Sequence, residues 1–194
     1  MTDLFPLAGP RALVTGGTRG IGRAISIRFA AAGASVIANY VRDQESAQTL
    51  KQQADASGYR LEICRADVTS PKGVDTLLEA VDAGGSGVSI FVHCAATGVH
   101  RPLGEFTLRH FDWTYALNAR AFLDLTQRLI PRMASPGSIL TISSEGAARA
   151  LPQYALVGSS KGALESMARH FAVELAPRGV RVNTVCPGGI DSGG

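Results

Sequence analysis

Short apolar runs alternate along the chain with segments in which apolar residues recur every three or four positions. The apolar runs predict six β-strands, at 11–15, 35–38, 61–67, 88–92, 138–142 and 180–185. The helical spacing predicts five helices, at 21–32, 47–54, 70–81, 108–133 and 164–175. This regular alternation of strand and helix indicates an α/β protein.

The predicted strands are almost continuously apolar, which is typical of a parallel sheet that is covered on both faces. Right-handed crossovers between such strands give a doubly wound, three-layer arrangement of the Rossmann type. The chain has 194 residues and contains no repeat and no linker-like stretch. We therefore expect one domain over residues 1–194.

The composition is that of an ordinary globular protein, with 45% hydrophobic residues, 18% charged residues and a formal net charge of +3. Because the arginines are dispersed, we expect no nucleic-acid partner. The sequence contains no membrane-span pattern and no secretory signal, which favours a cytoplasmic protein. Cys64, Cys94 and Cys186 are interpreted as reduced core residues, and the absence of metal-ligand spacing predicts no metal site.

A glycine-rich turn lies between the first strand and the first helix. A diphosphate bound there needs close backbone N–H groups, which glycine permits because it has no Cβ, and the helix N-terminus adds free donors. The turn therefore predicts a dinucleotide site. Its candidate cofactor-binding residues are Gly16, Thr18, Arg19, Gly20, Ile21 and Gly22.

The segment after the second strand indicates which dinucleotide is bound. An NAD site places an acidic residue there for the ribose 2′-hydroxyl, but this chain has Asn39, Tyr40 and Arg42. Arg42 and Arg19 supply guanidinium groups, which suit a 2′-phosphate. We therefore predict NADP(H), with Asn39, Tyr40 and Arg42 among the contacts.

In these motifs the chain resembles the short-chain dehydrogenase/reductase family. The turn from Thr15 to Gly22 matches the family's Thr-Gly-x-x-x-Gly-x-Gly motif, and further matches follow in order along the whole chain. The resemblance implies roles in cofactor binding for Asp67, Val68, Cys94, Ala95, Ala96, Lys161, Pro187, Gly188, Ile190 and Ser192. It also implies that Asn118 and Ser144 are active-site residues, with His93 and Cys94 at the place of two family asparagines.

One departure from the family pattern concerns the catalytic tyrosine. The family has Tyr-x-x-x-Lys, but Val157 stands four residues before Lys161, and the available tyrosine is Tyr154. This spacing resembles the enoyl-acyl-carrier-protein reductases, in particular the NADPH-dependent, type III-like branch. The resemblance implies that Tyr154 donates a hydrogen bond to a thioester oxygen and that Lys161 binds the nicotinamide ribose. Ser144 would orient substrate or Tyr154, and Asn118 would support a proton path or the helix backbone.

Three functions remain open at this point. The first is reduction of an enoyl thioester on a small or carrier-bound acyl substrate. The second is reduction of a ketone, such as a 3-oxoacyl or polyketide group, and the third is NADP(H) binding without turnover. The resemblance also implies a homodimer or homotetramer, and we expect the family's C-terminal lid and last strand to be absent from these 194 residues.

Overall fold

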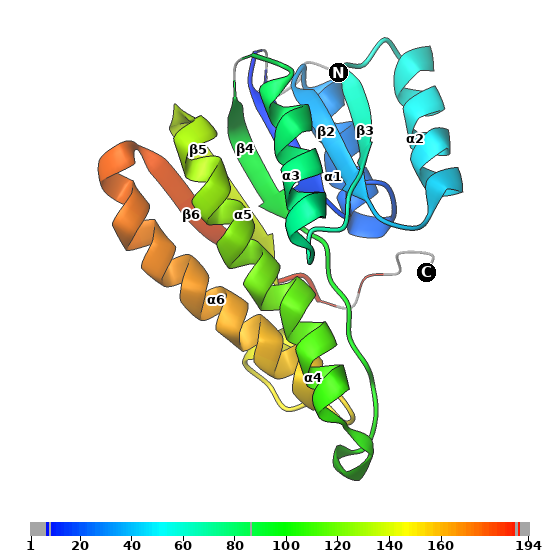
Figure 1. The fold of residues 1–194 in the computed structure, drawn as a ribbon, viewed down its shortest axis with the longest axis vertical. Coiled ribbons are helices and arrows are strands. Elements are labelled where there is room, and N and C mark those ends of the chain that lie inside the picture. The colour runs from blue at the N-terminus through cyan, green and yellow to red at the C-terminus, as the bar shows by residue number, and fades with distance from the viewer. Residues whose placement is uncertain (1–6, 8, 86, 189, 191–194) are drawn as a thin grey trace.

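The computed structural model describes residues 7, 9–85, 87–188 and 190 (Figure 1). Its centre is one parallel six-stranded sheet in the order β3-β2-β1-β4-β5-β6, which confirms the predicted Rossmann-type fold. The strands are β1 (Arg11–Thr15), β2 (Ser35–Tyr40), β3 (Leu61–Arg65), β4 (Val88–His93), β5 (Met133–Ile142) and β6 (Val180–Val185). The helices are α1 (Gly20–Ala31), α2 (Gln44–Ala56), α3 (Pro71–Asp82), α4 (Leu108–Tyr115), α5 (Ala121–Leu129) and α6 (Ala155–Leu175).

The strand order reverses direction between β1 and β4. Thr15 pairs with His93, and His93 pairs with Thr141, so the carboxyl ends of β1, β4 and β5 lie side by side. In an open parallel sheet, ligands bind beyond the carboxyl ends of the strands at such a switch point. The register therefore places the segments that follow these three strands around one candidate site.

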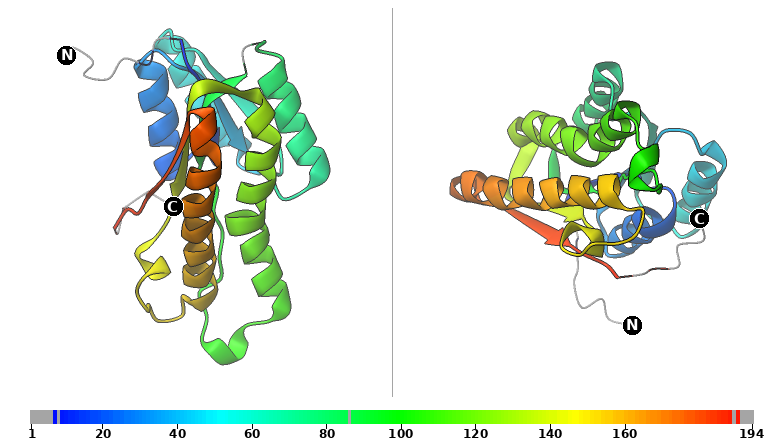
Figure 2. Two further views of the ribbon diagram at one scale, coloured as in Figure 1. Left: turned by 90° about the vertical axis from the view of Figure 1, so that its left-hand side faces the viewer. Right: turned by 90° about the horizontal axis from the view of Figure 1, so that it is seen from below.

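Helices cover the two faces of the sheet unequally. α3, α5 and α6 lie over one face, where Phe91, Phe122 and Leu164 belong to a buried cluster (Figures 1 and 2). α1 lies over the opposite face with α2 beside it, above a second cluster that includes Val14 and Leu50. Burial of these two apolar layers is the main force that holds the domain together.

The half of the α1 face over β4, β5 and β6 is open. A trough of about 980 Å³ runs there, and Leu140, Ile142 and Val185 of the strands and Ile25 and Phe29 of α1 contribute to its lining. Among the described residues only α1 and α2 cover this face (Figure 2). The second helical layer predicted from the sequence is therefore partial. None of the described helices is long and apolar enough to cross a membrane.

Several helix ends follow the local signals in the sequence. Ser70 caps α3 by accepting a 3.1 Å hydrogen bond from the Gly73 amide, and Pro71 occupies the first turn. Asp43 caps α2 by accepting from the Ser46 amide at 3.0 Å. A 2.7 Å hydrogen bond from the Ser46 hydroxyl, together with this amide contact, lowers the Asp43 pKa. These caps satisfy amides that have no partner within the helix.

The single helix predicted over 108–133 is wrong in two places. α4 ends at Tyr115, and a π-helical turn over Ala116–Arg120 separates it from α5. A 3₁₀ turn at Ile130–Arg132 follows α5 and contains Pro131, which cannot donate to a continuing helix. β5 then begins at Met133, earlier than the predicted start at Ser138.

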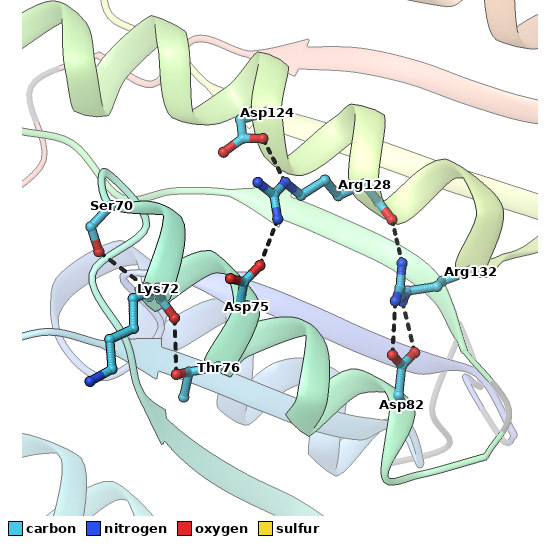
Figure 3. A network of polar contacts seen from close by, with 9 residues as sticks. Ser70, Lys72, Asp75, Thr76, Asp82, Asp124, Arg128 and Arg132 are labelled. Atoms are coloured by element: carbon cyan, nitrogen blue, oxygen red, sulfur yellow. Dashed lines mark hydrogen bonds and ion pairs between the residues drawn. The ribbon is translucent and has the colours of Figure 1, made fainter.

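Charged pairs on the surface join α5 and the turn after it to α3 (Figure 3). Arg128 donates to Asp124 at 2.8 Å and to Asp75 at 2.7 Å. Arg132 binds both oxygens of Asp82, at 2.8 and 2.9 Å, and this contact lowers the Asp82 pKa. Exposed pairs of this kind add little stability, so they fix the alignment of the two helices while the buried layer beneath supplies the free energy.

Candidate active site

The glycine-rich turn passes closely over neighbouring backbone. At Gly16, φ is +63°, and an added Cβ would lie 3.0 Å from the Ala95 Cα. At Gly22, in the first turn of α1, an added Cβ would overlap the carbonyl oxygen of Gly16. The backbone therefore forms a cradle that only glycine permits, at a helix N-terminus where a diphosphate would find free N–H donors.

Two interactions hold this cradle from below. The Gly17 amide donates to the Asn39 carbonyl at 2.9 Å, and the Ser26 hydroxyl donates to the Gly17 carbonyl at 2.9 Å. The Asn39 side chain is buried and donates to the Ala66 carbonyl at 2.9 Å. The NH2 group of its side chain is thus committed to protein carbonyls, and a contact of Asn39 with the cofactor stays a prediction.

The residues expected to hold the adenosine half lie around the carboxyl ends of β2 and β3. Arg19 and Arg42 are exposed, and Tyr40 is half-buried. One oxygen of Asp67 accepts from the amide and the hydroxyl of Thr69, at 2.9 and 2.7 Å. Val68 is 1% exposed and its side chain belongs to the core, so only its backbone can face a ligand.

Thr15 folds the segment after β4 back onto the glycine-rich turn. Its hydroxyl oxygen accepts from the amides of Cys94 and Ala95, at 3.2 Å each. Ala96 follows as an exposed residue. The Cys94 thiol is half-buried, and burial raises its pKa to about 11, so it stays protonated and unreactive at neutral pH. Cys186 is exposed, which corrects its interpretation as a core residue.

Tyr154 and Ser144 meet at the carboxyl end of β5. The Tyr154 hydroxyl lies 3.0 Å from the Ser144 hydroxyl, and Tyr154 is the N-cap residue of α6. The tyrosine ring lies against the backbone of Gly146, where an added Cβ would overlap it. His100 flanks the same ring, with ring centroids 5.1 Å apart. The structure thus brings together two of the predicted catalytic residues and holds the phenol in one orientation.

The turn before Tyr154 has an uncommon backbone. Gln153 adopts φ of +58°, a left-handed conformation that costs free energy in a residue with a Cβ, and its carbonyl accepts from the Arg101 amide at 3.2 Å. Neither Gln153 nor the supports Gly146 and His100 were identified from the sequence.

Lys161 lies two turns further along α6 and is buried, with 4% of its surface exposed. Its ammonium group donates to the Ile142 carbonyl at 2.7 Å, which leaves two protons for other acceptors. Burial lowers the pKa of Lys161 to about 8. The side chain therefore keeps a cation at the carboxyl end of β5 at neutral pH.

Asn118 lies in the π turn and all its amide groups are paired with protein. Its oxygen accepts from the Thr97 amide at 2.9 Å, and its nitrogen donates to the Thr97 carbonyl at 2.8 Å and to the Ser160 hydroxyl at 2.9 Å. These contacts join the segment after β4 to α6 beside Lys161. They favour support of the backbone, one of the two roles expected for Asn118, and they add Thr97 and Ser160, which the sequence did not reveal.

Val157 fills the position where the family's tyrosine would stand. It is 7% exposed and lies directly over Gly98, where an added Cβ would overlap a Val157 methyl group. Pro187 and Ile190 line the trough together with Thr18 and Ile21, which places the segment after β6 opposite the glycine-rich turn. Gly188 is exposed, and Ser192 falls outside the described residues.

The buried Lys161 predicts a rise in stability at alkaline pH. Its pKa is about 8 in the folded protein against an ordinary value of 10.5, so the unfolded chain binds more protons between these pH values. The free energy of unfolding should therefore increase from pH 8 to 10.5 by about 3 kcal/mol. Below pH 8, Lys161 is charged in both states, and the whole cost of burying its charge lowers the stability. Urea unfolding of the wild type and Lys161→Met at several pH values isolates this contribution, since all other groups are shared. An equal pH dependence in both proteins would contradict it.

Comparison with known proteins identifies relatives over nearly the whole chain. The family model described as Enoyl-(Acyl carrier protein) reductase matches residues 16–193. The 1-cyclohexenylcarbonyl-CoA reductase of Streptomyces collinus is 36% identical over 180 residues, which are 93% of this chain and 64% of the relative. The chain therefore spans slightly less than two thirds of that relative's length.

Solved structures agree with this relationship. A short chain dehydrogenase from Burkholderia cenocepacia in complex with NADP is 36% identical, with a TM-score of 0.91 over 96% of this chain and 76% of the other. The angucycline C-6 ketoreductase LanV with bound NADP is 35% identical, with a TM-score of 0.93 over 98% of this chain and 76% of the other. On the glycine-rich turn, the strand order and these matches, the chain belongs to the short-chain dehydrogenase/reductase family of oxidoreductases.

Proposed function

We propose that this protein is an NADPH-dependent reductase that acts on the C=C bond of an enoyl thioester. The observation that carries the proposal is the 3.0 Å contact of Tyr154 with Ser144, two helical turns from the buried Lys161. Val157 occupies the position from which the family's usual tyrosine would act. The acidic hydroxyl is thus displaced along α6, which suits an oxygen that is remote from the carbon being reduced.

The residues present fit the cofactor. The cradle at Gly16 and Gly22, which a Cβ would fill, would hold the diphosphate, and Arg19 and Arg42 would bind the 2′-phosphate. Lys161 has two free protons for the ribose hydroxyls. Bound NADPH would supply the hydride that the β-carbon of the substrate accepts.

Tyr154 would stabilise the charge that the reaction develops. When the β-carbon of an enoyl thioester is reduced, negative charge moves to the thioester oxygen. A phenol O–H fixed beside that oxygen binds the charged transition state more strongly than the neutral substrate. Ser144 would accept or donate at the same phenol oxygen and so orient it, and the Lys161 cation favours negative charge nearby.

A ketoreductase is the second candidate, and the LanV structure favours it. That relative is named a ketoreductase and matches with a TM-score of 0.93. In this reaction the carbonyl carbon is reduced and Tyr154 would give its proton to the adjacent oxygen. The same residues would serve both reactions. The two reactions differ in the position of the carbon that accepts the hydride relative to the Tyr154 phenol.

The substrate is proposed to be an acyl group on a small molecule or a carrier, and the protein is proposed to be a cytoplasmic homodimer or homotetramer. The name of the Streptomyces relative, a reductase of a cyclohexenylcarbonyl-CoA, supports the thioester class. Leu108, Phe111 and Trp113 of α4 are 83%, 42% and 47% exposed and give apolar surface for contact between subunits.

One assay separates the candidate functions. Purified protein is mixed with NADPH and either crotonyl-CoA or acetoacetyl-CoA, and the loss of NADPH absorbance is followed. Oxidation with crotonyl-CoA supports the proposal, and oxidation with acetoacetyl-CoA alone overturns it in favour of the ketoreductase. Oxidation with neither, together with calorimetric binding of NADPH, indicates a nucleotide-binding protein without turnover.

The coenzyme preference is tested by Arg42→Ala. Removal of one charge-assisted contact to the 2′-phosphate is expected to weaken NADPH binding by about 10- to 100-fold, corresponding to about 1.5–3 kcal/mol. Binding of NADH should change little, because NADH has no phosphate there. Calorimetry measures both affinities, and Arg109→Ala, an exposed arginine on α4, is the matched control. An equal loss of affinity for both coenzymes would show that Arg42 does not bind the 2′-phosphate.

A further inference from the structure

The π turn deprives the carbonyl of the half-buried residue Leu117 of its helical partner. In an α-helix the amide of Ala121 would donate to the carbonyl of Leu117, four residues earlier. Here the Ala121 amide donates to the Ala116 carbonyl instead. The Leu117 carbonyl therefore needs a donor from outside the helix, since an unpaired buried carbonyl costs about 1–3 kcal/mol.

His93 supplies that donor from the end of β4. The residue is fully buried, and its Nε2 lies 3.2 Å from the Leu117 oxygen. Because a carbonyl only accepts, Nε2 must carry the proton. The ring is fixed between Phe91 and Phe122, with centroid distances of 6.2 and 5.5 Å.

The other nitrogen of His93 faces the glycine-rich turn. Nδ1 lies 3.4 Å from the Thr15 hydroxyl, whose oxygen already accepts from the Cys94 and Ala95 amides. The Thr15 proton can therefore point to Nδ1 or to the Val92 carbonyl, also at 3.4 Å. Burial and the nearby Lys161 cation lower the pKa of His93 to about 3, so the imidazole is neutral at neutral pH.

We infer that His93 is a positioning residue, which holds the π turn at Leu117 through Nε2–H and joins it to Thr15 through Nδ1. The next residue of that turn is Asn118, which binds Thr97 and the Ser160 hydroxyl beside Lys161. One neutral imidazole thus sets the spacing between the glycine-rich turn and the α6 residues. The catalytic consequence rests on the proposed function, whereas the tautomer and its contacts do not.

The first test measures the imidazole itself. In ¹⁵N-labelled protein, long-range ¹H–¹⁵N spectra should show His93 as the neutral Nε2–H tautomer, unchanged between about pH 5 and 8. The signal is assigned by its loss in His93→Gln. A neutral Nδ1–H tautomer, or protonation within this range, would overturn the inference, whether or not the protein reduces any thioester.

The second test compares two side chains of equal length, His93→Gln and His93→Met. The Gln amide can donate to the Leu117 carbonyl, whereas Met fills similar space without a donor. With the substrate that the assay above identifies, His93→Gln should keep kcat within about twofold, and His93→Met should lose about tenfold, equivalent to 1.4 kcal/mol or one lost hydrogen bond. KM for NADPH should be similar in both.

The assays are made well below the unfolding temperature of each variant, so that lost stability does not mimic lost turnover. Equal kcat in the two variants would show that His93 only fills space. If no substrate is turned over, the proposed function fails, and the spectra still decide the contacts of His93.

Discussion

Replacement of Tyr154 by phenylalanine is expected to lower kcat by about 10²- to 10⁴-fold, the range for loss of a proton donor or an oxyanion donor. The phenyl ring keeps its contacts with Gly146 and His100, so the fold around it is preserved. Calorimetric affinity for NADPH should stay within about twofold, because Tyr154 acts on the substrate oxygen. Stopped-flow or steady-state turnover measures the loss.

The control for this experiment is Tyr59→Phe. Tyr59 is half-buried and lies just before β3, which is separated from β5 in the sheet by β2, β1 and β4. This variant also removes a tyrosine hydroxyl, but not the one that contacts Ser144, and its turnover should match that of the wild type. Unchanged turnover in Tyr154→Phe would remove Tyr154 from the mechanism. A loss of NADPH affinity in the same variant would instead point to a role in cofactor binding.

The fold could be predicted because its signals are local. Most strands of the sheet contain a short run rich in apolar residues, and the crossover rules leave few ways to connect parallel strands through helices. Ser70 and Pro71 marked the start of α3 because a cap acts within four residues of itself. β6 was predicted at its observed bounds, Val180–Val185, since Gly179 and the following apolar run define it.

The π turn could not be predicted because its cause is distant in the sequence. Asn118 is held by Thr97 and Ser160, 21 and 42 residues away. Its apolar neighbours fit helical spacing as well as they fit the observed turn. A pattern of period 3.6 therefore predicts one continuous helix, and only tertiary contacts reveal the break.

The candidate site likewise combines features with local sequence signals and features that depend on tertiary contacts. Ser144 and the glycine-rich turn were each predicted at the end of a strand, and they share one edge of the sheet because the carboxyl ends of parallel strands meet there. The direction of a side chain is set by its local surroundings, so the sequence did not reveal that the Asn39 NH2 group donates to the Ala66 carbonyl. The left-handed backbone at Gln153 gave no signal, because glutamine has no preference for that conformation.

The glycine-rich turn gives the second large expected effect. Gly22→Ala is expected to weaken NADPH binding by about 100-fold or more and to lower the free energy of unfolding by about 1–3 kcal/mol, as overpacking does. The added methyl group would overlap the Gly16 carbonyl oxygen, which belongs to backbone and cannot rotate away. The turn must therefore shift off α1, and its N–H groups no longer converge on a diphosphate.

Gly104→Ala is the matched control for Gly22→Ala. Its added Cβ would meet no atom within 4 Å, so the same chemical change is made in open space. Calorimetry with NADPH and thermal unfolding with and without the coenzyme separate lost binding from lost stability. Alanine favours helix over glycine by about 1 kcal/mol, so a stable Gly22→Ala variant is compatible with a shifted turn. Wild-type NADPH affinity in Gly22→Ala would contradict a shifted turn, because it would mean that the diphosphate is held somewhere other than this turn.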